Sequence, residues 1–163
     1  MTNFAANNGY MAKEIERKFL VTDTGFLSKL ISHKHIRQAY LSDRPEATVR
    51  LRVTDSQAFI TVKNKNKKNE RDEWEYEIPT SDALEMMDRC QCTGMIEKTR
   101  YIDGRWEIDV FHGRLDGLVM AEIELRTSDE QVVIPRYIGR EVTDDARYYN
   151  SSLATADILP PFK

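Results

Sequence analysis

The feature that most constrains the fold is an alternation of charged and apolar side chains, which first occurs at residues 14–21, EIERKFLV. Successive side chains of a β-strand point to opposite faces. Glu14, Glu16 and Lys18 therefore share one face, while Ile15, Phe19 and Val21, interrupted by Arg17, share the other. The segment predicts a strand with one ionic face and one face that packs in a core.

The same alternation recurs and predicts further strands at residues 36–41, 47–53, 58–63, 71–78, 95–101, 105–111 and 118–125. Helical spacing and capping residues predict short helices at residues 25–32, from residue 80 to Gly94, at 127–133 and at 143–154. Most connections between strands are short, and about eight strands are enough to close a barrel and remove its edges. The pattern predicts an α+β chain built on an antiparallel sheet or barrel with a few helices.

The ionic faces carry different signs on different strands. The basic residues are Arg50, Arg52, Lys63, Lys98 and Arg100, and the acidic ones are Glu73, Glu75, Glu107, Asp109, Glu122 and Glu124. One explanation is a solvent-exposed face of an antiparallel sheet. The other is a closed interior, in which basic pairs at i, i+2 bind successive phosphates and carboxylate pairs bind Mg²⁺ or Mn²⁺. The pattern alone leaves both open, and the second predicts a metal-bound polyphosphate.

The composition limits the domain count and the class of partner. A chain of 163 residues predicts a single domain, here over residues 11–163 after a disordered polar segment at residues 1–10. The net charge of −3, from 24 basic and 27 acidic residues, argues against a generic nucleic-acid or membrane binder. The chain shows no signal-peptide pattern and no apolar run of about 20 residues. Together with Cys90 and Cys92, which we interpret as reduced thiols, this predicts a cytoplasmic protein.

Several smaller features are interpreted as structural rather than catalytic. His33 and His35 are expected to be polar turn residues, because no partner ligand lies nearby in the sequence. The basic stretch 64–70 is expected to be a solvated hairpin loop rather than a gate for substrate. Trp74 and Trp106 fall on the apolar faces, where packing in a core explains them better than stacking on a ligand. No GxxxxGK[ST] motif is present, so the chain is not a P-loop enzyme.

An ordered series of short motifs resembles a known family. Residues 14–18 match an ExExK signature, and further blocks follow at residues 38–41, 49–52, 71–75, 97–101, 107–111, 121–124, 141–143 and 147–150. The chain resembles the CYTH superfamily of triphosphate tunnel metalloenzymes over roughly residues 13–155, and its short, single-domain bacterial members in particular. The resemblance implies an eight-stranded antiparallel β-barrel, a tunnel that binds a linear triphosphate with a divalent metal. A C-terminal helix beginning at Arg147 and Tyr148 would close one tunnel mouth.

The resemblance also implies roles for individual residues. Those expected to bind the triphosphate are Lys18, Arg50, Arg52, Lys63, Lys98 and Arg100. The expected ligands of Mg²⁺ or Mn²⁺ are Glu14, Glu16, Asp109, Glu122 and Glu124, with Glu73 and Glu75 ordering water or a second metal. In the expected mechanism Glu16 orients the attacking water, and Lys98 or Arg100 stabilises the leaving phosphate.

The expected substrate is inorganic tripolyphosphate, because no motif for binding adenine or thiamine is evident. The alternatives are a thiamine triphosphatase, a nucleoside triphosphatase or a class IV-type adenylyl cyclase. A non-catalytic polyphosphate-binding module is a further alternative, disfavoured by the many carboxylates. No nucleic-acid or membrane partner is expected, and the resemblance allows a homodimer.

Overall fold

The computed structural model describes residues 12–65 and 70–162. The predicted disordered segment, residues 1–10, lies outside this range, as does most of the predicted loop at residues 64–70. No helix within the described residues is long and apolar enough to cross a membrane.

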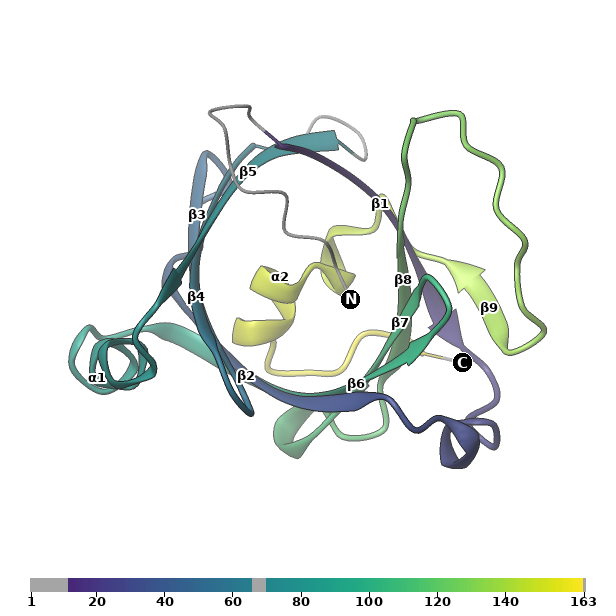
Figure 1. Ribbon diagram of the computed structural model, residues 1–163, viewed down its shortest axis with the longest axis horizontal. Coiled ribbons are helices and arrows are strands. Elements are labelled where there is room, and N and C mark those ends of the chain that lie inside the picture. Colours follow the sequence, from purple (N-terminus) through teal and green to yellow (C-terminus); the bar gives the residue numbers. More distant parts are fainter. Residues whose placement is uncertain (1–11, 66–69, 163) are drawn as a thin grey trace.

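The described chain forms one antiparallel sheet with short helices (Figure 1). The strands are β1 (Ala12–Val21), β2 (His33–Ser42), β3 (Ala47–Thr54), β4 (Ala58–Asn64), β5 (Glu70–Ile78), β6 (Thr93–Asp103), β7 (Trp106–Phe111), β8 (Val119–Glu124) and β9 (Ile138–Glu141). The helices are α1 (Thr80–Arg89) and α2 (Asn150–Thr155), with 3-10 turns η1 (Leu27–Lys29), η2 (Gly113–Leu115) and η3 (Ala146–Tyr148). The strand order is β5-β4-β3-β2-β6-β7-β8-β1-β9, and a further pairing of β5 with β1 closes an eight-stranded barrel. The predicted fold class is confirmed.

The first strand closes the barrel because its two halves pair with different partners. On one edge, Glu14 lies opposite Arg71 of β5, and further along Phe19 lies opposite Glu141 of β9. On the other edge, Lys18 lies opposite Glu122 of β8. The short β9 therefore continues the edge of β1 beyond the point where β5 ends.

One core lies inside the barrel and is completed by the C-terminal helix. Inward side chains at one end of the strands, among them Leu20, Tyr40 and Phe111, form a buried cluster with Tyr148 of η3 and Leu153 of α2. Figure 1 shows α2 within the ring of strands. The expectation that the C-terminal helix closes one end is met, with Tyr148 in the turn that precedes α2. We call the opposite end, to which the described part of this cluster does not extend, the open end.

The second core lies on the outer surface of the barrel. The outward side chains of β1, including Ile15 and Phe19, pack with Trp106 and Ile123. Trp106 meets Phe19 edge to face, with ring centroids 5.6 Å apart, so its predicted packing role is confirmed. The alternating sequence therefore places apolar groups outside, under the flanking segments, and ionic groups inside.

Three predictions of local structure were wrong. Residues 127–133 form a bend, a short turn and irregular chain instead of a helix, because the carboxylate of Glu130 accepts hydrogen bonds from Arg105 Nη1 at 2.6 Å and from the Arg126 amide at 2.6 Å. The helix predicted at 143–154 begins only at Asn150, the first residue of α2. The chain just before it still pairs with β1, since the Val142 amide donates a hydrogen bond to the Lys18 carbonyl at 2.8 Å. The helix predicted at 25–32 is reduced to η1.

The predictions for the histidines and cysteines had different outcomes. His33 and His35 belong to β2, so the predicted turn was wrong at these positions. Cys90 and Cys92 are both free thiols, as predicted, and the Cys92 thiol lies 3.8 Å from the Met86 carbonyl oxygen.

Candidate active site

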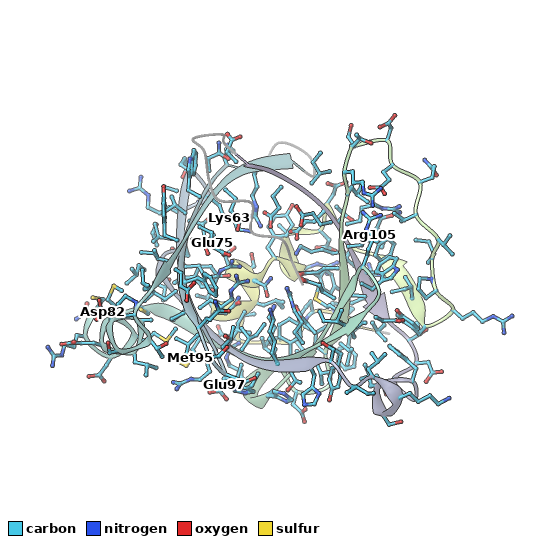
Figure 2. All side chains as sticks on the ribbon, viewed as in Figure 1. Lys63, Glu75, Asp82, Met95, Glu97 and Arg105 are labelled. Carbon is cyan, nitrogen blue, oxygen red and sulfur yellow. The ribbon has the colours of Figure 1, made fainter. Side chains whose placement is uncertain are left out.

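The inner face of the barrel carries the charged side chains that were predicted from the sequence. The period of two that turns Leu20 inward also turns Glu14, Glu16 and Lys18 inward, and the cross-strand pairs extend this face around the ring. Figure 2 shows Lys63 and Glu75 inside the ring of strands, whereas Asp82 lies on α1 outside it. The ionic faces are thus the wall of an enclosed interior, and the alternative of a solvent-exposed sheet face is wrong.

The first ionic group lies where β1, β4 and β5 meet. The Glu14 carboxylate accepts hydrogen bonds from Lys63 Nζ at 2.7 Å and from Arg71 Nε at 2.8 Å. Lys63 Nζ also lies 2.9 Å from Glu73. Burial alone would raise the pKa of Glu14, but the charges of Lys63 and Arg71 hold that pKa well below its ordinary value. The pKa of Glu73 is raised by its burial in spite of Lys63.

The lysine of the ExExK signature bridges two carboxylates. Lys18 Nζ lies 2.6 Å from Glu122 and 2.9 Å from Glu16, and the lysine is only 5% exposed. Burial would lower the pKa of Lys18, yet the two carboxylates raise it above its ordinary value. Lys18 is therefore a permanent cation in the middle of the wall.

The deepest ionic group centres on Asp109, which is 0% exposed. Its carboxylate accepts hydrogen bonds from Lys98 Nζ at 2.6 Å and from Arg100 Nε and Nη2 at 2.6 and 2.7 Å. Arg100 also reaches Glu122 at 2.9 Å and forms an ion pair with Glu107. Burial lowers the pKa of Lys98, and this effect together with the charge of Arg100 outweighs the opposing effect of Asp109. Lys98 thus gives up its proton more readily than an ordinary lysine does.

Two neighbouring arginines share one carboxylate on the opposite wall. Glu75 lies 2.9 Å from Arg52 and 3.5 Å from Arg50, and it accepts a hydrogen bond from the Thr61 hydroxyl at 2.7 Å. Burial and the adjacent Arg50 lower the pKa of Arg52 to about 10, so both guanidinium groups stay charged at neutral pH. The Nε atoms of Arg50 and Arg52 are buried and have no hydrogen-bond partner among the described residues. A buried donor without a hydrogen-bond partner destabilises the folded protein by about 1–3 kcal/mol. Oxygen atoms of a ligand would accept hydrogen bonds from these donors and remove that cost.

Two carboxylates face each other where β1 pairs with β8. Glu16 lies opposite Glu124 in the register of these strands. Burial raises the pKa of Glu124, and the negative charges of Glu14, Glu107 and Glu16 raise it further. A divalent cation would relieve this repulsion. Among the described residues, no three His, Cys, Asp or Glu side chains lie in an arrangement ready to hold a metal ion, because most of the predicted ligands are paired with lysine or arginine.

Comparison with known proteins decides the family. The model of the CYTH domain matches residues 12–155. The chain belongs to the CYTH domain family. A curated inorganic triphosphatase of Acetivibrio thermocellus is 42% identical to it over 147 residues, which cover 88% of this chain and 94% of the relative. A curated inorganic triphosphatase of Nitrosomonas europaea is 36% identical over 149 residues, covering 86% of this chain and 96% of the relative.

Solved structures agree with this assignment. The crystal structure of an inorganic triphosphatase superposes with a TM-score of 0.64 at 32% identity, covering 90% of this CYTH chain and 100% of the other. A putative adenylate cyclase from Bacillus halodurans has a TM-score of 0.58 at 18% identity, covering 72% of this chain and 84% of the other. At that identity the likeness shows the shared fold alone.

Some residues of this CYTH interior were missed as candidates by sequence reasoning. Arg71 holds Glu14 and lies 3.6 Å from Glu16. It was placed on the ionic face of its strand but given no role, although its position in a charged, alternating strand was a usable signal. Asn150, at the start of α2, accepts a hydrogen bond from Lys98 Nζ at 3.3 Å. No sequence pattern indicates that contact, because the two residues are 52 positions apart.

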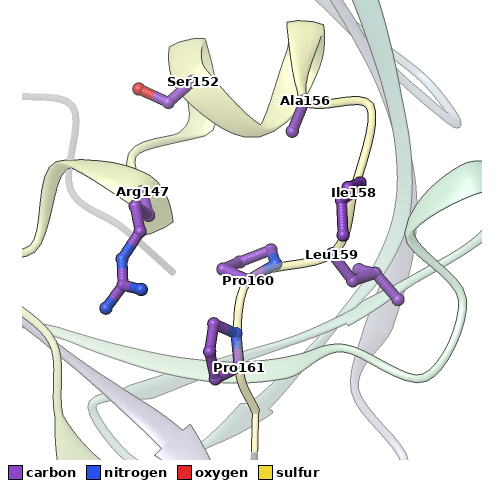
Figure 3. Close-up of a pocket in the computed structure, with 7 residues that line it drawn as sticks. All are labelled: Arg147, Ser152, Ala156, Ile158, Leu159, Pro160 and Pro161. Carbon is purple, nitrogen blue, oxygen red and sulfur yellow. The ribbon is translucent and has the colours of Figure 1, made fainter.

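Two surface pockets lie away from the predicted site residues. A pocket of about 370 Å³ lies beside the C-terminal segment and is lined by Arg147, Ser152, Ala156, Ile158, Leu159, Pro160 and Pro161 (Figure 3). Another, of about 530 Å³, is lined by Arg17, Leu125, Ser128, Glu130, Gln131, Glu141, Thr143 and Asp144. Neither contains a residue predicted to bind phosphate or metal, so the chemistry is assigned to the ionic interior.

Proposed function

We propose that this CYTH protein is an inorganic triphosphatase, which hydrolyses tripolyphosphate to pyrophosphate and phosphate in the ionic interior of the barrel. The observation that carries the proposal is the pair of buried, unpartnered Nε donors of Arg50 and Arg52 on a wall lined with further lysines and arginines. A linear polyphosphate offers oxygens along its whole length, and guanidinium groups bind them with strong charge-assisted hydrogen bonds. The curated names of the two bacterial relatives support the same substrate.

In the proposed binding mode, the cations and the carboxylates of the wall exchange their ion-pair partners. In the free protein Lys18, Lys63, Lys98, Arg50, Arg52 and Arg100 are held by carboxylates. The anionic substrate would take over these cations. The carboxylates released in this way, together with Glu124, would turn to a divalent cation. This explains why a site for a polyanion carries so many acidic side chains.

The residues proposed to hold the metal, Mg²⁺ or Mn²⁺, are Glu14, Glu16, Asp109, Glu122 and Glu124. The repulsion that raises the pKa of Glu124 fits such a cation, as does the all-oxygen donor set. The bound metal would supply charge neutralisation for the phosphates and lower the pKa of the attacking water. Glu73 and Glu75, which flank the same interior, are proposed to order further water.

The proposed mechanism uses few side chains. Glu16 accepts a hydrogen bond from the attacking water and orients it towards the reacting phosphorus. The new bond forms between the water oxygen and phosphorus while the bond to the bridging oxygen breaks. Lys98, whose pKa is lowered by burial, donates a hydrogen bond or a proton to the leaving phosphate. Arg100 stabilises the negative charge that develops there.

The test is phosphate release from tripolyphosphate, thiamine triphosphate and ATP, measured side by side with Mg²⁺, with Mn²⁺ and with a chelator. We expect metal-dependent release that is fastest from tripolyphosphate. Glu16→Gln should lower kcat by about 100-fold or more, since it removes the group that orients the water. Glu46→Gln, at an exposed turn carboxylate, is the matched control and should leave kcat unchanged.

Each alternative function gives a different result. Faster turnover of ATP or thiamine triphosphate would reassign the substrate. Formation of a cyclic nucleotide from ATP would indicate a cyclase. Tight binding of tripolyphosphate without phosphate release from any substrate would indicate the non-catalytic module. Full activity of Glu16→Gln at saturating metal would refute the role given to Glu16.

A further inference from the structure

Lys34 lies on the inner face of the barrel, at the open end. It shares its face of β2 with Gln38 and with Tyr40, which packs against α2 in the inner core. Six residues of extended strand separate Lys34 from Tyr40, a distance of about 20 Å. In the register of β2 and β6, Lys34 lies directly opposite Arg100. The lysine therefore lies level with Arg100 on the neighbouring strand and adds a cation to the wall at the end away from α2.

Lys34 differs from the other inward cations in having no partner among the residues that the structure describes. The lysines and arginines of the predicted wall are each bound to at least one carboxylate. Within the described part of the chain, Lys34 forms no ion pair and no side-chain hydrogen bond, although it is half-buried. Burial and the positive charges of Arg100 and Arg52 lower the pKa of its ammonium group. In the free protein the charged form of Lys34 is thus unfavourable, and the charges of Glu107 and Asp109 offset only part of that cost.

An unpartnered cation at this place is suited to an incoming anion. Its neighbours Arg100 and Arg52 must exchange carboxylates for substrate, whereas Lys34 can bind an oxygen without breaking an existing pair. An ammonium on a flexible stem suits a mobile terminal group, because it binds as a point charge without a fixed geometry. The nearest carboxylates, Glu107 and Asp109, are already engaged by Arg100.

We propose that Lys34 binds the terminal phosphate of the substrate at the open end and selects inorganic tripolyphosphate over nucleoside triphosphates. This inference rests on the proposed function. The terminal phosphate of tripolyphosphate has two ionisable oxygens and carries more than one negative charge near neutral pH. In a nucleoside triphosphate whose far phosphate lies deep in the interior, the group at the open end is an ester phosphate with one negative charge and a bulky nucleoside. Lys34 gains more from the first than from the second.

The experiment compares Lys34→Met, Lys34→Arg and the control Lys29→Met, whose exposed lysine lies on η1. The affinities for tripolyphosphate and for ATP are measured by calorimetry in the presence of a chelator. The kcat/KM values for tripolyphosphate and ATP are measured with Mg²⁺. Thermal unfolding without ligand shows whether each variant folds as the parent does.

We expect Lys34→Met to weaken tripolyphosphate binding and lower its kcat/KM by about tenfold, the effect of losing one charge-assisted hydrogen bond. The affinity and the kcat/KM for ATP should fall by less than about threefold, so the ratio of the kcat/KM for tripolyphosphate to that for ATP decreases. Lys34→Arg should retain most of the preference, and Lys29→Met all of it. The Tm of Lys34→Met should equal or exceed that of the parent, because the substitution leaves no partner unpaired.

The two proposals fail in distinguishable ways. A parent protein that binds tripolyphosphate but does not hydrolyse it overturns the proposed function, while weaker binding by Lys34→Met still supports the contact with Lys34. A hydrolytic parent whose Lys34→Met variant keeps its tripolyphosphate affinity overturns the inference alone. Equal losses for tripolyphosphate and ATP also overturn it, because they would show a general electrostatic effect without selection.

Discussion

The ionic interior makes Asp109→Asn a sharp test of how this barrel is held together. Asp109 is 0% exposed and accepts three charge-assisted hydrogen bonds, one from Lys98 and two from Arg100, all between 2.6 and 2.7 Å. The substitution keeps the shape of the side chain but removes its negative charge. It also turns an amide group, which donates hydrogen bonds, towards one of the two cations.

The expected cost follows from this geometry. Removing one partner from a buried ion pair typically destabilises a protein by about 3–5 kcal/mol, since the remaining charge is left uncompensated. Arg100 keeps its ion pairs with Glu107 and Glu122, whereas Lys98 loses its ion pair and keeps the amide oxygen of Asn150 and the ring face of Phe111. A domain of this size loses about 2–4 °C of Tm per kcal/mol, so the Tm should fall by about 6–20 °C.

The assay is thermal and urea unfolding followed by circular dichroism, with Asp157→Asn as a control at an exposed carboxylate. Added tripolyphosphate should raise the Tm of Asp109→Asn more than that of the parent, because the ligand supplies the missing negative charge. A loss of free energy of unfolding below about 1 kcal/mol would refute the reasoning, because it would show that Asp109 is not needed to balance these cations.

Three further predictions concern acid stability and the packing of α2. Lys18 and Arg100 hold the pKa of Glu122 well below its ordinary value against the effect of burial, so the contribution of this carboxylate to stability is lost as pH falls below about 5. The difference in Tm between the parent and Glu122→Gln should therefore shrink towards pH 3, measured in the presence of a chelator. Arg114 donates hydrogen bonds to backbone carbonyls at the end of α2, so Arg114→Met should lower stability by about 1–3 kcal/mol and speed amide exchange in α2. Gly94 has a φ of +64°, and a Cβ there would overlap the Ala154 carbonyl, so Gly94→Ala should lower the Tm well below that of Gly104→Ala, where φ is +60° and no atom lies near. Equal Tm values for the two glycine variants would exclude the overlap as a cause.

The sequence predicts the inner and outer faces of the strands well, because the alternation is local. Glu14, Glu16 and Lys18 point inward and Phe19 points outward, as their spacing indicates. The closure of the barrel is different. Closure depends on the pairing of β1 with β5. Glu14 and Arg71 face each other in this pairing but are 57 positions apart in the sequence, and no local pattern encodes a contact over that separation. Barrel closure was therefore expected only from the family resemblance.

The elements that were missed are short or depend on distant contacts. β9 has four residues, too few for an alternation to be recognised, and exists because the edge of β1 is available to it. The capping residues at 127–129 are typical of a helix start, but Glu130 forms an ion pair with Arg105 in the turn between β6 and β7. The partners within the site were likewise unpredictable. The sequence indicates which charges share the interior, but not that Arg100 would bind Asp109 and Glu122 together.

The position of α2 has a kinetic consequence. The helix and Tyr148 fill one end of the barrel with apolar side chains, so we expect substrate and products to enter and leave at the other end. Pyrophosphate formed next to Lys98 and Arg100 would have to leave past the place where the next substrate enters. We therefore expect pyrophosphate to inhibit competitively, and its departure to limit the turnover rate once hydrolysis itself is fast.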